Sequence, residues 1–194
     1  VIEAKWLFNL TPDQIDVIVH PQSIVHSLVQ FEDGSMKAQM GLPDMKLPIQ
    51  YAFTYPKRIK TSFPRFNFLD YPNLTFEKAD VKTFKNLALA YQAMEMGGTA
   101  ACALNAGNEV AVDAFLKEEI SFLQIFDINE ETLKGVPVIL QPDLEAYIET
   151  DKKARQFALN FIAQLNVPED IGNILKTSCY DCHSNEVVYP YNLH

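Results

Sequence analysis

The stretch HPQSIVHSLVQFEDGSMKAQMGLPDM, residues 20 to 45, decides how this chain of 194 residues is interpreted. Before it, Ile15 to Val19 alternate as a short strand, which His20-Pro21 ends because proline removes an amide donor. Ile24 to Phe31 and Ser35 to Met40 predict two further strands. The Asp33-Gly34 pair between them is a strong hairpin signal, since glycine accepts positive φ. The stretch therefore predicts a polar loop at a strand end followed by a β-hairpin, and loops of this kind commonly carry ligand sites.

Three strings in the chain carry a resemblance to a known family: HPQSIVHS, GLPDMKLPIQYA and, further along, ALNAGNEV. Together they resemble the 1-deoxy-D-xylulose 5-phosphate reductoisomerase family, from Val1 to about Ile162 and with family-like spacing, which is more specific than any single motif. The resemblance implies a metal-dependent rearrangement of the sugar phosphate followed by hydride transfer from NADPH. The product would be 2-C-methyl-D-erythritol 4-phosphate, in non-mevalonate isoprenoid biosynthesis. The resemblance also implies a cytoplasmic homodimer.

The resemblance assigns roles to residues of the opening stretch. It places His26 at the active site, and Pro43 and Met45 along the substrate and nicotinamide side of the pocket, where a thioether can pack on a flat ring and exclude water. Ser23 can offer a hydroxyl to the phosphorylated substrate, and His20 is the second histidine candidate. From the residues alone, His26 is equally well explained as a histidine at a strand end that caps backbone carbonyls. Without the resemblance, Met45 would be assigned to the core.

The cofactor sites are expected upstream of this chain. No Gly-x-Gly-x-x-Gly occurs in it, so the dinucleotide-binding half of a reductase is not in these residues. In the family, the metal carboxylates also precede this segment, and the last of them stands just before Val1. Hard oxygen ligands suit Mg²⁺ or Mn²⁺. We expect no metal ligand in this chain, because Glu3 is a single carboxylate on a helix and such a group is more often solvated or salt-bridged.

The composition excludes several classes of partner. A net charge of −9 with only 16 Lys and Arg argues against nucleic acid and anionic membranes, since both require a basic face. No apolar run approaches the roughly 20 residues of a membrane helix. Cys102 lies among small apolar residues, which favours a buried, inert thiol in a reducing cytoplasm. Asn105, Asn108 and Glu109 share one helix face. Amides buried between packed helices and bonded to backbone are a better interpretation than a site, since a polar network can fix helix register.

The predicted fold class is α+β, a partial mixed sheet with a hairpin followed by a helical bundle. We expect part of a catalytic α/β domain over residues 1–56, an irregular connector over 57–81, a C-terminal helical domain over 82–165 and a tail over 166–194. Helical signals cover Ile2 to Phe8, Pro43 to Tyr55, Thr83 to Met96, Leu104 to Leu116, Ile120 to Leu133 and Asp143 to Leu165.

Apolar spacing also predicts which side chains of the first helices are buried. Trp6 is expected in the core, and Ile49, Ala52 and Phe53 are expected on the buried side of their helix. Leu74 to Phe76 read as a possible short edge strand.

The tail carries a motif that the family does not explain. Cys179, Cys182 and His183 form Cys-x-x-Cys-His, the attachment pattern of c-type haem. A chance match, or half of a zinc site with His194, are the alternatives, but zinc wants four ligands. Because covalent haem is made outside the cytoplasm, we interpret the tail as a second gene joined at about Leu165, with a natural fusion as the weaker alternative.

Two rival functions follow from these features. One is a c-type haem-binding protein for electron transfer or sensing, in which the body is a carrier. The other is a non-catalytic dimerisation module, since the hairpin Ile24 to Met40 can extend a sheet across two subunits.

The isolated chain is expected to be inactive as a reductoisomerase, because the nucleotide domain and metal ligands of the family lie upstream. Oxidation of NADPH in the presence of 1-deoxy-D-xylulose 5-phosphate and Mg²⁺ or Mn²⁺ is the measurement. Turnover by residues 1 to 194 alone would refute the expectation.

Overall fold

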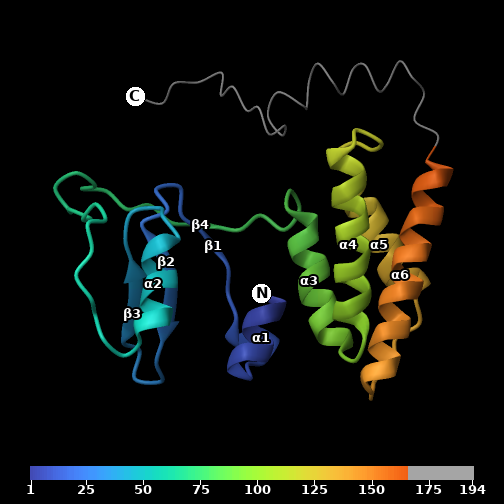
Figure 1. Ribbon diagram of the computed structural model, residues 1–194, viewed down its shortest axis with the longest axis horizontal. Helices are drawn as coiled ribbons and strands as arrows, with labels where there is room; N and C mark the ends of the chain where they lie inside the picture. Colours follow the sequence, from blue (N-terminus) through green and yellow to red (C-terminus); the bar gives the residue numbers. More distant parts are fainter. Residues whose placement is uncertain (166–194) are drawn as a thin grey trace. The chain divides into compact units, whose positions relative to one another are not determined.

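The computed structural model describes residues 1–165 and divides the chain into two compact units. One unit, here called the helical unit, consists, among the described residues, of Val1–Ile15 and residues 80–165. The other, here called the hairpin unit, is Asp16–Ala79. Figure 1 shows the helices of the first and the strands of the second. The tail candidates Cys179, Cys182 and His183 lie outside the described residues. Among residues 1–165, no helix is long and apolar enough to cross a membrane.

The helical unit is built around one small-residue helix. Its elements are α1 (Ile2–Phe8), the 3₁₀ turn η1 (Pro12–Gln14), α3 (Lys85–Met96), α4 (Ala100–Leu116), α5 (Gln124–Gly135) and α6 (Leu144–Gln164). α4 packs against α3, α5 and α6, which lie beside it in Figure 1. Its buried face is mostly alanine: Ala100, Ala103, Ala106, Ala111 and Ala114. Because the distance between helix axes depends on the side chains at the contact, these alanines allow close packing.

The turn between α3 and α4 is tied to the segment that precedes α6. Thr99 is fully buried; its N–H donates to the Ile139 carbonyl oxygen at 3.1 Å, and its Oγ1 accepts from the Ile139 N–H at 3.1 Å. Gly98 has a φ of +51°, and a Cβ atom there would collide with the Ile139 carbonyl. Glycine is therefore required at Gly98 both for its backbone conformation and for the approach of Ile139.

An asparagine cluster links three of these helices. Asn129 of α5 is 1% exposed, and its Nδ2 donates to Asn86 Oδ1 and to Asn108 Oδ1, each at 3.0 Å. The three amides come from α5, α3 and α4, so one buried side chain fixes the register of three helices. Asn108 does join a polar network between helices, but it is only partly buried and its partner is the Asn129 side chain rather than backbone. Asn105 is exposed and bonds to Glu109 on its own helix.

The hairpin unit contains two antiparallel strand pairs and one helix. β1 (Ile18–Val19) pairs with β4 (Glu77–Lys78), and β2 (Val25–Gln30) pairs with β3 (Met36–Met40). At the hairpin tip, Gly34 has a φ of +82° and Asp33 Oδ1 accepts from the Ser35 N–H at 2.9 Å. Hydrogen bonds from the Ser35 hydroxyl and from its N–H lower the pKa of the Asp33 carboxyl. α2 (Lys46–Thr54) follows.

The α+β class, the hairpin and the helices are confirmed, and several details are corrected. Trp6 is 62% exposed rather than core, because none of the seven residues of α1 is buried. Ile49 and Phe53 are 50% and 86% exposed, so the predicted buried face of α2 is wrong in this unit. The edge strand falls at Glu77–Lys78 rather than at Leu74 to Phe76, since pairing with β1 sets its position.

Replacement of Asn129 by alanine is expected to lower the free energy of unfolding by about 2 kcal/mol, because the Oδ1 atoms of Asn86 and Asn108 lose their donor in a part-buried site. Urea unfolding followed by circular dichroism is the measurement. The matched control is Asn160→Ala on α6, which removes an exposed amide that accepts from Gln156 and is expected to change stability by less than about 0.5 kcal/mol. Equal unfolding midpoints for the two variants would contradict the network.

Candidate functional site

The loop after β1 begins where backbone pairing with β4 stops. Val19 pairs with Glu77, and continued antiparallel pairing would bring Pro21 opposite Thr75. Proline has no N–H to donate, so the ladder cannot continue through Pro21. The residues that follow are therefore free to form a loop, provided that other groups hold them.

Side chains replace the missing backbone bonds. Gln22 Oε1 accepts from the Thr75 N–H at 3.2 Å, and Gln22 Nε2 donates to Thr75 Oγ1 at 2.9 Å. The His20 ring stacks on Phe76 with centroids 4.5 Å apart and an interplanar angle of 17°. His20 Nδ1 lies 2.7 Å from the Thr75 carbonyl oxygen. Because a carbonyl oxygen only accepts, this nitrogen carries the proton and donates.

Ser23 is held in an uncommon backbone conformation. Its φ is +48°, and its N–H donates to the His20 carbonyl oxygen at 2.9 Å. The next residue, Ile24, is fully buried, and its carbonyl oxygen accepts from the Gly41 N–H at 3.0 Å. The loop is thus fixed on both sides of Ser23, whose own side chain is exposed.

His26 lies on β2, beside the turn that precedes α2. A Cβ atom on Gly41 would lie 3.8 Å from His26 Nε2 and 3.2 Å from Leu47 Cδ2. The structure therefore brings the exposed imidazole of His26 together with the segment Gly41 to Leu47, as a hairpin with this register requires.

Pro43 and Met45 belong to that same turn. Asp44 organises it: its N–H donates to the Leu42 carbonyl at 2.7 Å, and its Oδ1 accepts from the Lys46 N–H at 2.9 Å. The Lys46 N–H lowers the pKa of the Asp44 carboxyl. Both Pro43 and Met45 are exposed, Met45 by 67%. Met45 is therefore not core in this unit.

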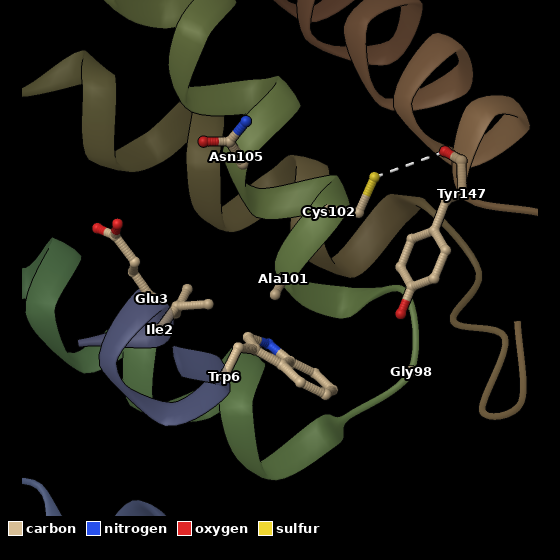
Figure 2. Close-up of a pocket in the computed structure, with 8 residues that line it drawn as sticks. All are labelled: Ile2, Glu3, Trp6, Gly98, Ala101, Cys102, Asn105 and Tyr147. Atoms are coloured by element: carbon tan, nitrogen blue, oxygen red, sulfur yellow. Dashed lines mark hydrogen bonds between the residues drawn. The ribbon is translucent and has the colours of Figure 1, made fainter. Parts of the chain in front are cut away.

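A cavity in the helical unit escaped the sequence analysis. It has a volume of about 410 Å³ and is lined by Ile2, Glu3, Trp6, Gly98, Ala101, Cys102, Asn105 and Tyr147 (Figure 2). The lining comes from α1, the α3–α4 turn, α4 and α6, segments far apart in the sequence. No local sequence pattern predicts that these residues come together.

Within residues 1–165, no group of three or more His, Cys, Asp or Glu could hold a metal ion.

The polar face of α4 next to this cavity is occupied by an ion-pair cluster. Arg155 of α6 donates to Glu109 Oε2 at 2.6 Å and, through two nitrogens, to Asp151 at 2.8 and 3.1 Å. Asn105 Nδ2 donates to Glu109 Oε1 at 3.0 Å. The Arg155 bond holds the pKa of Glu109 below its usual value, and the two carboxylates raise the pKa of Arg155. Glu109 is thus engaged in a structural contact between helices.

Cys102 is expected to react slowly with iodoacetamide at neutral pH. Its Sγ donates to the Tyr147 carbonyl at 3.6 Å, and partial burial raises the pKa of the thiol, so little thiolate is present (Figure 2). In a Cys179→Ser, Cys182→Ser variant, alkylation of Cys102 should be slower than that of glutathione and should rise as pH passes above the ordinary thiol range. Alkylation as fast as glutathione at neutral pH would contradict this expectation.

Comparison with known proteins places this geometry in a family. A family model described as DXP reductoisomerase C-terminal domain matches residues 40–157. The 1-deoxy-D-xylulose 5-phosphate reductoisomerase of Phocaeicola vulgatus is 56% identical over 163 residues, which cover 84% of this chain and 43% of the relative. That of Chloroherpeton thalassium is 50% identical over 157 residues, covering 81% of this chain and 41% of the relative. The chain therefore spans less than half the length of these relatives.

Solved structures agree. The reductoisomerase from Zymomonas mobilis in complex with NADPH matches with a TM-score of 0.78 and 37% identity, over 84% of this chain and 43% of that one. A DOX-P reductoisomerase in complex with NADPH, fosmidomycin and magnesium matches with a TM-score of 0.78 and 39% identity, over 84% of this chain and 42% of that one.

A second family model, described as haem-binding domain, matches residues 144–194. It overlaps the first model over residues 144–157, within α6, and continues through the Cys-x-x-Cys-His motif. The resemblance of the tail to a haem-binding domain is thus supported.

The body of the chain, from its model match and its relatives, belongs to the 1-deoxy-D-xylulose 5-phosphate reductoisomerase family and carries the C-terminal part of it.

Proposed function

We propose that this chain supplies the C-terminal part of an enzyme that rearranges 1-deoxy-D-xylulose 5-phosphate and reduces it with NADPH to 2-C-methyl-D-erythritol 4-phosphate, a step of non-mevalonate isoprenoid biosynthesis. The single observation that carries this proposal is 56% identity over 163 residues to a reductoisomerase. Because the aligned residues make up 84% of this chain, the identity extends over both the helical unit and the hairpin unit.

The hairpin unit would form one wall of the substrate pocket. Ser23 and His26 expose a hydroxyl and an imidazole, which can hydrogen-bond to a sugar phosphate. Pro43 and Met45 expose apolar surface on the adjacent turn. Because exposed apolar groups gain from being covered, this turn suits a flat ring or a ligand that excludes water. His20 would act through the loop rather than by contact.

The cofactors belong to the upstream part of the enzyme in this proposal. NADPH supplies the hydride, and Mg²⁺ or Mn²⁺ polarises oxygen atoms of the substrate. The described residues do not fit a metal centre, since no cluster of candidate ligands exists among residues 1–165. The contribution of this chain is therefore to bind and orient the sugar phosphate and to exclude water.

Assembly as a cytoplasmic homodimer is part of the same proposal. β2 and β3 form a two-stranded sheet whose outer edges are unpaired among the described strands. A second copy of the hairpin could extend this sheet across a two-fold axis. The free Cys102 thiol is compatible with a reducing compartment.

A chimera tests the proposal directly. It joins the upstream part of the Phocaeicola vulgatus enzyme, up to the residue aligned with Val1, to residues 1–165 of this chain. We expect reductoisomerase activity within about tenfold of the native relative, because small repacking errors at the new junction cost on the order of 1 kcal/mol. A folded chimera that binds NADPH but turns over no sugar phosphate would contradict the proposal.

In that chimera, His26→Ala is expected to lower kcat/KM for the sugar phosphate by about 100-fold or more, the usual contribution of a positioned imidazole. The matched control is Gln30→Ala, an exposed residue on the same strand, which should change kcat/KM less than about twofold. Because both side chains are exposed, neither substitution should lower the stability of the fold appreciably. Equal activity of the two variants would remove His26 from the site.

Haem attachment at Cys179, Cys182 and His183 is a second candidate function, favoured by the family-model match over residues 144–194. The two thiols would add to the haem vinyl groups, and the histidine would ligate the iron. In this candidate, the electron-transfer or sensing role belongs to the tail.

Export of the chain to a compartment with the cytochrome c maturation machinery should give haem absorbance that survives denaturation, because thioether bonds are covalent. The variant Cys179→Ser, Cys182→Ser should lose it entirely, and His183→Ala should alter the spectrum through the iron ligand. Absence of covalent haem in the unsubstituted chain would exclude this function.

A further inference from the structure

The loop between β1 and β2 is held at two points. At its start, His20 is bonded to Thr75 through Nδ1 and stacked on Phe76. At its end, the buried Ile24 side chain and the bond between its carbonyl and Gly41 fix the chain again. Only three residues lie between these points, and Ser23 is one of them. The position of the Ser23 hydroxyl therefore depends on both anchors.

His20 is poorly placed to bind a ligand itself. Its Nδ1 is engaged with the Thr75 carbonyl, and its Nε2 has neither solvent access nor a hydrogen-bond partner in residues 1–165. One ring face is covered by Phe76. These contacts instead reach Ser23 through the backbone, because the His20 carbonyl oxygen accepts the Ser23 N–H at 2.9 Å.

The conformation of Ser23 needs such support. A residue other than glycine seldom adopts positive φ, and strained conformations of this kind persist only where the surrounding structure determines them. Here the determining contacts run from Thr75 and Phe76, through the His20 ring, to the His20 carbonyl.

We propose that His20 is a positioning residue, which holds Ser23, and with it the start of the strand that carries His26, in the geometry that the sugar phosphate requires. This inference rests on the proposed function. It changes the role of His20 from a ligand of the substrate to a side chain that acts through the loop, chiefly by its donor to Thr75, with the stacking on Phe76 as the lesser contact.

Two variants separate the two contacts of His20. His20→Asn keeps a donor, since the Asn side-chain nitrogen occupies nearly the place of Nδ1, and it removes the ring. His20→Phe keeps a ring to stack on Phe76 and removes the donor. If the donor to Thr75 controls the loop, His20→Asn should keep the parent loop geometry and His20→Phe should lose it.

Kinetics of the chimera give the functional test. We expect His20→Phe to raise KM for the sugar phosphate about tenfold, because small displacements of binding groups have effects of this size or greater, and to leave KM for NADPH within about twofold of the parent. His20→Asn should return KM for the sugar phosphate to within about threefold of the parent. If both KM values rise together, or if neither variant changes KM, His20 has only a structural role and the inference is overturned.

Amide exchange on the 194-residue chain gives a test that does not depend on activity. The Ser23 N–H should exchange about tenfold faster in His20→Phe than in the parent and in His20→Asn, because its acceptor has moved. The Gly41 N–H, which donates to Ile24, is the internal control and should be unchanged. If the parent chimera is inactive but the exchange rates follow this pattern, the proposed function is rejected and the role of His20 in holding Ser23 stands. If Ser23 exchange is unchanged in His20→Phe, that role is rejected whether or not the chimera is active.

Discussion

The missing N–H of Pro21 is the constraint on which the proposed site depends. It stops the β1/β4 ladder after Val19, and a loop held only by backbone would be free to move from that point. The side chains of His20 and Gln22 take over the contacts with Thr75 that the backbone cannot make. A short loop, held by these contacts and with an exposed serine, results directly before the strand that carries His26. The polar groups offered to a ligand and the groups that hold them are therefore different residues.

In the helical unit, small residues determine how closely the helices pack. The alanine face of α4 lets α3, α5 and α6 approach closely, and Asn129 fixes their register through two amide bonds. The cluster of Arg155 with Glu109 and Asp151 adds a link between α4 and α6 at the surface. Stability in this unit thus rests on close contacts and on the amide cluster around the buried Asn129, and Asn108 and Glu109 of α4 are engaged in contacts between helices.

The hairpin and the helices could be predicted because local sequence patterns specify them. The Asp33-Gly34 turn and the alternation around it specify the hairpin, and apolar periodicity specifies the helices. The exposure of Trp6 and Phe53 could not be predicted, since an amphipathic pattern shows which face is apolar and not what covers it. The partners of His20 lie 55 and 56 positions along the chain, at Thr75 and Phe76, so only the folded structure shows that its ring is engaged. The cavity beside Cys102 could not be predicted for the same reason, because four segments that are far apart in the sequence form it.

The central claim is that this chain is the C-terminal part of a reductoisomerase whose cofactor and metal sites lie upstream of Val1. One continuous read of the source DNA, from well upstream of Val1 to beyond His194, tests it most directly. We expect a single reading frame that encodes a nucleotide-binding half and a glutamate immediately before Val1. A frame that starts near Val1 and continues past His194 into a complete haem-binding domain would contradict the claim, because the body would then be a carrier without the groups that the reaction requires.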